Sequence, residues 1–156
     1  MGVPLACFLT WTCYGTWLPG DDRGSVDDQH NRFGGAIVEP DALSVHHAGL
    51  AMSEPAFKMG DEERRAVDAA IRQTCAIRRW AAHAVNVRTN HVHVVVAAAG
   101  VSPERAMGTL KSWATRALRT IDRHADRRRF WTNQGSNRWL WSDEQMRAAV
   151  VYTLNQ

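Results

Sequence analysis

HAVNVRTNHVHVVVA, residues 83–97, is the segment that decides the fold, because it predicts two strands joined by a tight turn. Both halves are rich in valine, a residue that favours strands. Asn90 suits the turn between them, where a left-handed backbone conformation is expected. Two strands so close in sequence pair as an antiparallel hairpin. The other elements are therefore placed around a hairpin over 83–87 and 91–97.

Two helix signals flank this hairpin. Residues 61–82 begin with acidic side chains and end with arginines, the arrangement that the helix dipole favours. Ser102 is a suitable N-cap for a helix over 102–122, and Pro103 fits its first position. The whole predicted order is strand 5–17, helix 61–82, strands 83–87 and 91–97, helix 102–122, strand 138–141 and helix 142–156.

The remaining segments are predicted to connect these elements. Residues 18–35 are rich in Pro, Gly and Asp and indicate a long loop, while 36–60 leave open a short helix. Residues 123–138 indicate a basic connection. The order of strands and helices predicts an α+β protein with a ferredoxin-like antiparallel sheet and helices packed on one face. We expect one domain over 1–156.

The composition narrows the class of protein. Hydrophobic residues make up 45% of the 156, which is enough for one buried core. The first residues lack the basic start of a signal peptide, and no apolar run approaches the roughly 20 residues of a membrane span. The three cysteines form no CxxC pair, so reduced thiols in a cytoplasmic protein are expected.

Positive charge is concentrated in residues 101–130. This segment holds eight Lys and Arg residues against three Asp and Glu, although the chain as a whole carries only +3. Such a segment suits a polyanion, since each neutralised phosphate releases counterions. Charge alone favours the simpler interpretation, a solvated helix face. Trp131, Trp139 and Trp141 are candidates for stacking on unpaired bases.

His91 and His93 lie two residues apart on a predicted strand, so both side chains point to one face and the intervening valines to the other. Their Cα atoms are expected roughly 6.8 Å apart. Imidazole is a common ligand of divalent metals, but a firm site needs a third ligand. A His-x-His pair on a solvent-facing strand also arises by chance, and taken alone that explanation is preferred.

Tyr152 and Gln156 lie four apart on the last predicted helix and therefore share a face. The amide oxygen of Gln156 suits Mg²⁺ or Mn²⁺, and the phenol of Tyr152 is a potential nucleophile. Considered alone, the pair is explained as well by a core aromatic residue and a solvated helix end.

Together these motifs resemble those of the single-tyrosine HUH transposases, the enzymes of small insertion sequences and the REP-associated tyrosine transposases. The similar segments are FLTWTCYGTWLPGDDRG (8–24), NHVHVVV (90–96), LKSWATRAL (110–118), GSNRWLW (135–141) and YTLNQ (152–156). Asp21, Asp22 and Arg23 belong to the first of these, and no chemical role is assigned to them.

The resemblance implies an activity and its residues. His91, His93 and Gln156 match the ligands of a divalent metal, Mg²⁺ or Mn²⁺, and Tyr152 matches the nucleophile that forms a 5′-phosphotyrosine link. The implied partner is single-stranded DNA beside a hairpin, and the chain would act as a monomer or a homodimer. Candidate DNA contacts are Lys111, Arg116, Arg127, Arg128 and Arg129.

Two alternatives stay open. A domesticated protein of this fold would bind DNA without cleaving it. A small metal-dependent hydrolase would use His91 and His93 without needing Tyr152.

Overall fold

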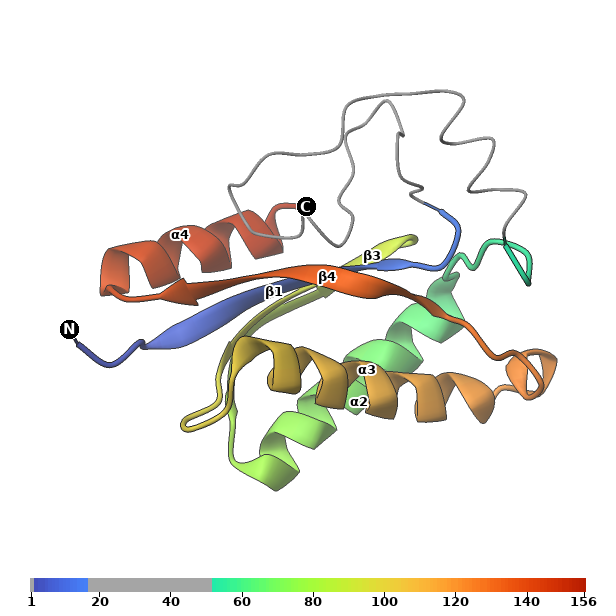
Figure 1. Ribbon diagram of the computed structural model, residues 1–156, viewed down its shortest axis with the longest axis horizontal. Coiled ribbons are helices and arrows are strands. Elements are labelled where there is room, and N and C mark those ends of the chain that lie inside the picture. Colours follow the sequence, from blue (N-terminus) through green and yellow to red (C-terminus); the bar gives the residue numbers. More distant parts are fainter. Residues whose placement is uncertain (1, 17–51) are drawn as a thin grey trace.

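A computed structural model describes residues 2–16 and 52–156 (Figure 1). The elements are β1 (Ala6–Cys13), α2 (Asp61–Arg78), β2 (Ala81–Val87), β3 (His91–Ala97), α3 (Pro103–Arg119), the short 3₁₀ helix η1 (Asp122–His124), β4 (Trp131–Leu140) and α4 (Asp143–Leu154). The strands form one antiparallel sheet in the order β2-β3-β1-β4. The predicted loop 18–35 and residues 21–23 lie outside the described residues, as does most of the ambiguous segment 36–60.

The predicted α+β class and antiparallel sheet are confirmed, but the helices do not all pack on one face as predicted. α2 and α3 lie on one face of the sheet as expected, whereas α4 lies on the opposite face (Figure 1). α4 goes there because that face carries an apolar cluster of its own, which includes Phe8, Val95 and Leu140. Met146 and Val150 of α4 pack against this cluster.

β3 is covered on both faces. Val92, Val94 and Val96 belong to the larger core beneath α2 and α3, while Val95 belongs to the cluster beneath α4. A strand that is covered on both faces is apolar at consecutive positions, which explains the three successive valines 94–96 near the end of β3. His91 and His93 share the α4 face with Val95, as strand alternation predicts.

β4 is longer than predicted. A strand was expected only over 138–141 and a connection over 123–138, but the strand begins at Trp131 and pairs with β1 along its length. Gly135 makes this pairing fit under α3, because an added Cβ would lie 2.6 Å from both the Thr10 carbonyl oxygen and the Met107 sulfur. The prediction failed because β4 is an edge strand with a polar, glycine-containing sequence.

Other element ends shift by a few residues. α2 ends at Arg78, before the predicted 82, because Arg79 adopts a left-handed conformation with φ of 59° and β2 begins at Ala81. Among the described residues other than glycine, Arg79 alone has a positive φ. The prediction that Asn90 adopts a left-handed backbone conformation was therefore wrong. The tight turn between β2 and β3 is confirmed.

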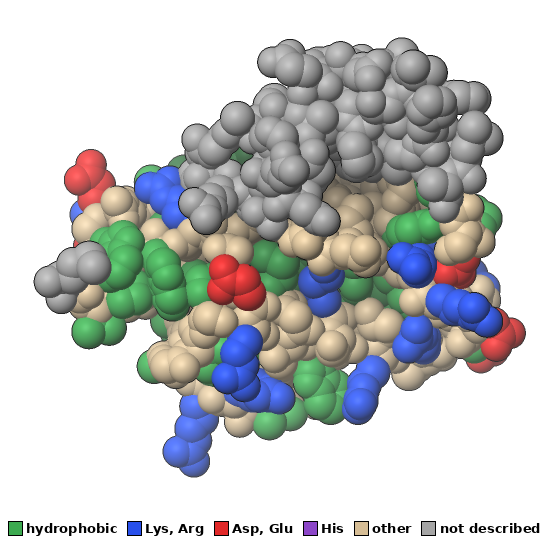
Figure 2. Space-filling model, viewed as in Figure 1, with side chains coloured by type: hydrophobic (Ala, Val, Ile, Leu, Met, Phe, Trp, Pro, Cys, Tyr) green, Lys and Arg blue, Asp and Glu red, His purple; other side chains and the backbone are tan. Residues whose placement is uncertain are grey.

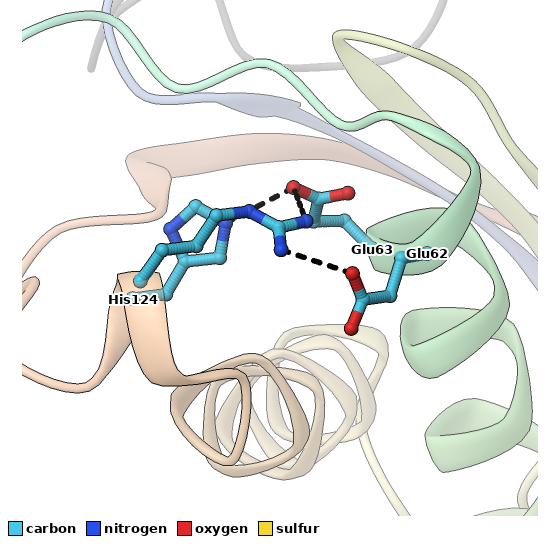
Figure 3. Close-up of polar contacts among 4 residues, drawn as sticks. Glu62, Glu63 and His124 are labelled. Atoms are coloured by element: carbon cyan, nitrogen blue, oxygen red, sulfur yellow. Dashed lines mark hydrogen bonds and ion pairs between the residues drawn. The ribbon is translucent and has the colours of Figure 1, made fainter.

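A polar cluster fixes the start of α2 to η1. The Glu63 carboxylate accepts hydrogen bonds from Arg123 at 2.7 Å and from His124 Nε2 at 3.0 Å, and Arg123 also bonds to Glu62 (Figure 3). Glu63 is buried. Burial alone would raise the pKa of its carboxyl group, but the hydrogen bonds from His124 and Arg123 outweigh this effect and lower it to about 2.

Candidate active site

The two histidines predicted to act together do lie together. β3 places both rings on the face that α4 covers, with centroids 4.7 Å apart and planes at 75°. His93 is buried, whereas His91 is partly exposed. The pair therefore has one shielded and one more accessible imidazole.

α4 brings Tyr152 to the same place. The centroid of its ring lies 5.6 Å from that of His93. Phe8 of β1 lies 5.7 Å from His93 in a stacked arrangement and 5.9 Å from Tyr152 edge-on. Strands β1 and β3 and helix α4, distant in sequence, thus meet at one aromatic cluster. Tyr152 is half exposed, so its phenol is accessible from solvent.

Each histidine is oriented through its Nδ1 atom. Nδ1 of His91 lies 2.7 Å from Asn90 Oδ1, and Nδ1 of His93 shares a hydrogen bond of 2.8 Å with Thr10 Oγ1. Because an amide oxygen only accepts, the His91 proton sits on Nδ1 and the lone pair on Nε2. Metal-binding histidines typically hold their second ring nitrogen in this way.

Sequence reasoning missed both of these supporting residues. Asn90 was interpreted only as a turn residue, although its position next to His91 was a usable signal. Thr10 reaches His93 through the pairing of β1 with β3, in which Thr10 lies opposite His93. That register cannot be read from the sequence, so Thr10 gave no signal.

The environment keeps both imidazoles neutral. Burial lowers the pKa of His93 to about 4, with further lowering by His91 and by Arg88. Burial and then Arg88 also lower the pKa of His91. Neutral imidazole is the form that ligates metals, so the pair fits a divalent cation. In the described part of the chain no three His, Cys, Asp or Glu side chains gather as a metal site.

Gln156 lies near this cluster at the end of the chain. Its side-chain amide nitrogen donates to the Tyr152 carbonyl at 3.3 Å, and its main-chain oxygen accepts from Arg88 at 2.6 Å. Asn86, which lies opposite His93 in the β2–β3 pairing, donates to the Thr153 carbonyl at 2.8 Å. These bonds hold the last turn of α4 against β2. Convergence of the Gln156 amide with the two histidines on one ion stays a prediction.

A groove of about 550 Å³ opens beside the phenol. Phe8, Arg138, Gln145 and Tyr152 are among the residues that line it, and it runs between α4 and the end of β4. It is large enough for a bound small molecule or a short stretch of polymer. Arg138 places a positive charge in the same groove as the proposed nucleophile.

The predicted DNA-contacting cations have different surroundings. The Arg127 guanidinium lies 5.1 Å from the Phe57 ring and 5.9 Å from the Phe130 ring, and it donates to the Pro55 carbonyl. The main-chain N–H groups of Arg128 and Arg129 donate to the Glu54 carboxylate. The structure thus gives Arg127 a role in holding the fold, and DNA contact by these three residues stays a prediction.

Lys111 and Arg116 lie on α3, on the opposite face of the sheet from Tyr152. The Lys111 amine donates to the Thr132 carbonyl at 2.8 Å, and burial lowers its pKa to about 8. The Arg116 guanidinium lies 4.6 Å above the ring of exposed Trp113. The structure therefore does not bring the five predicted cations together at one surface with Tyr152.

Comparisons with known proteins define the class. The fold is similar to that in a crystal structure of a candidate transposase from Deinococcus radiodurans R1, which superposes with a TM-score of 0.50 at 14% identity, covering 99% of this chain and 92% of that one. The model of the family described as "Transposase IS200 like" matches residues 53–144, more than half of the chain. The chain belongs to this family. The matched region contains His91 and His93 and ends before Tyr152.

No curated protein matches the sequence. None of the helices in residues 52–156 is both long and apolar enough to cross a membrane.

Proposed function

We propose that this protein cleaves and rejoins single-stranded DNA through a covalent link to Tyr152. The observation that carries the proposal is the position of Tyr152, which lines a groove and lies next to His93, one of two adjacent imidazoles that are each held through Nδ1. Membership of the transposase family makes DNA the substrate. The family resemblance points to a strand with a neighbouring hairpin.

The reaction exchanges one phosphate ester for another. The Tyr152 oxygen attacks phosphorus in line and forms a new P–O bond while the bond from phosphorus to the 3′ oxygen breaks. The phosphate stays on the 5′ oxygen of the downstream fragment, which is thereby linked to Tyr152. The 3′ oxygen gains a proton and leaves as a hydroxyl group, and the phenol loses its proton. Because the new link is still a phosphodiester, a 3′-hydroxyl can attack it and rejoin strands without ATP.

The phenol requires assistance, since a tyrosine hydroxyl has a pKa near 10. His91 and His93 fit Mg²⁺ or Mn²⁺, with Gln156 as the proposed third neutral ligand. When bound, the cation stabilises negative charge that develops on the phosphate oxygens. Asn90 and Thr10 fix the two rings, and Phe8 packs against both His93 and Tyr152.

Trapping the covalent adduct tests the proposal. Labelled single-stranded DNA carrying candidate element ends is incubated with the protein and Mn²⁺, and adducts are resolved on a denaturing gel. Tyr152→Phe should abolish the adduct. Tyr14→Phe is the matched control, because Tyr14 is the other tyrosine of the sequence and bonds to the main chain of Ser53.

An adduct that persists in Tyr152→Phe would refute the assignment of the nucleophile. Cleavage without any adduct would support the hydrolase alternative. DNA binding with neither cleavage nor adduct, in a protein with both histidines intact, would support the domesticated alternative.

A further inference from the structure

A second groove lies on the other side of the sheet, between α3 and β4. Its volume is about 540 Å³, and we refer to it as the α3–β4 groove. Side chains that line it include Glu104, Met107, Lys111, Asn133, Asn137 and Trp139. Figure 2 shows the molecule from the side on which α3 and β4 lie in front, and positive side chains are spread over this part of the surface.

Gly108 in this groove is not explained by the fold. It lies inside α3, and a Cβ added there would meet nothing within 4 Å. Glycine inside a helix is destabilising relative to alanine, and here no neighbour requires it. Glycine is also the residue used where a ligand approaches the backbone closely. Gly108 therefore points to a ligand that fills the groove.

Gly135, which also lines the groove, differs from Gly108 because its surroundings require glycine. An added Cβ at Gly135 would lie 2.6 Å from the Thr10 carbonyl oxygen, so the sheet itself requires glycine at that position. Only one of the two glycines that line this groove is therefore explained by packing. The space next to Gly108 is open to the groove and is not filled by core side chains.

The chemistry of the lining suits an unpaired nucleotide. Asn133 and Asn137 offer amides that match the donor and acceptor edges of bases, and the Glu104 carboxylate can accept from a base N–H group. The partly exposed indole of Trp139 can stack on any base. The Lys111 ammonium has three N–H groups, one of which bonds to Thr132, and it suits a phosphate or a base carbonyl oxygen.

One residue of the edge strand β4 lines both grooves. Arg138 lines both the α3–β4 groove and the groove beside Tyr152. β4 is an edge strand, so a polymer can pass around it from one face to the other. We propose that the α3–β4 groove binds one unpaired base of the same DNA strand whose phosphate reaches Tyr152. This inference rests on the proposed function, since it takes DNA as the substrate.

The test separates base contacts from backbone contacts. Fluorescence anisotropy measures the affinity of the full chain, carrying Tyr152→Phe to prevent cleavage, for labelled (dT)20 and for a 20-mer of abasic sites with the same backbone. Gly108→Leu fills the open space with a good helix former, and Trp139→Ala removes the indole. Trp113→Ala is the control, because Trp113 is also an exposed tryptophan but does not line the groove.

We expect Gly108→Leu and Trp139→Ala to weaken (dT)20 binding roughly 5- to 150-fold, the usual effect of one lost base stack. Abasic binding should change less than about twofold, and Trp113→Ala should leave the preference for bases intact. The melting temperature of Gly108→Leu should not fall, which separates lost binding from lost folding.

The proposal is overturned if both groove variants keep the wild-type preference for (dT)20 over the abasic strand. It is equally overturned if the variants lose affinity for both strands alike. If the chain with the unsubstituted groove binds neither strand, the inference fails. Adduct formation by the wild-type chain, measured separately, shows whether the proposed function has failed with it.

Discussion

The buried carboxylate of Glu63 provides the most direct test of how the fold is held together. Its side chain is 8% exposed and receives hydrogen bonds from Arg123 and His124 (Figure 3). Folding lowers its pKa from 4.5 to about 2. At about 1.4 kcal/mol per pKa unit, the shift corresponds to about 3 kcal/mol. Because Arg123 is 53% exposed, solvent screening reduces this to about 2 kcal/mol.

Glu63→Gln removes the charge with little change in shape. We expect it to lower the free energy of unfolding at pH 7 by about 2 kcal/mol, and the melting temperature by about 4–8 °C for a chain of this size. Glu62→Gln is the matched control. Glu62 also bonds to Arg123 but is 56% exposed, so its loss should cost less than about 1 kcal/mol.

The sign of the pH dependence follows from the direction of the shift. A carboxyl group whose pKa is lower in the folded state stabilises the protein above its unfolded pKa and loses that effect as pH falls. The wild-type advantage over Glu63→Gln should therefore be full above about pH 4.5 and shrink as the pH falls toward 2. Urea denaturation followed by circular dichroism at several pH values measures it. Equal losses for the Glu62 and Glu63 variants, or a gap that is independent of pH, would refute the reasoning.

Three further predictions concern the backbone and the histidine pair. Gly135→Ala should destabilise the protein by about 1–3 kcal/mol in thermal denaturation, because its Cβ would overlap the Thr10 carbonyl oxygen; unchanged stability would contradict the packing of β4. Arg79→Gly should raise the free energy of unfolding by about 1 kcal/mol in the same assay, because glycine adopts the left-handed conformation at the end of α2 without steric cost. A lower free energy of unfolding would show that contacts of the arginine side chain outweigh this backbone effect. Asn90→Ala should weaken Mn²⁺ binding about 10- to 100-fold in a titration followed by electron paramagnetic resonance, because it frees the His91 ring to rotate; unaltered affinity would argue against His91 as a ligand.

The parts of the fold that depend on local pattern could be predicted. Strand alternation placed His91 and His93 on one face, and capping residues placed the starts of α3 and α4 to within one residue. The hairpin was evident because two valine-containing segments are separated by a short polar turn. In each case the signal and the structure it specifies involve residues close in sequence.

The parts that depend on pairing between distant segments could not be predicted. Most of β4 was assigned to a connection, because its polar sequence becomes a strand only through its pairing with β1. The hydrogen bond from Thr10 to His93 needs the β1–β3 register. Arg127 was predicted only as a candidate DNA contact, and its packing over the rings of Phe57 and Phe130 could not be read from the sequence.

Differences in burial explain how one small site could both bind a metal and present a nucleophile, the two parts of the proposed chemistry. A ligand must hold a lone pair, and His93, at 5% exposure, is shielded enough for its pKa to fall to about 4. A nucleophile that attacks a polymer must be reachable, and Tyr152 is 50% exposed at the edge of a groove. Helix α4 packs over β2 and β3 and places the Tyr152 ring 5.6 Å from that of buried His93. The proposed site therefore depends on the position of α4 on the second face, which the sequence pattern did not reveal.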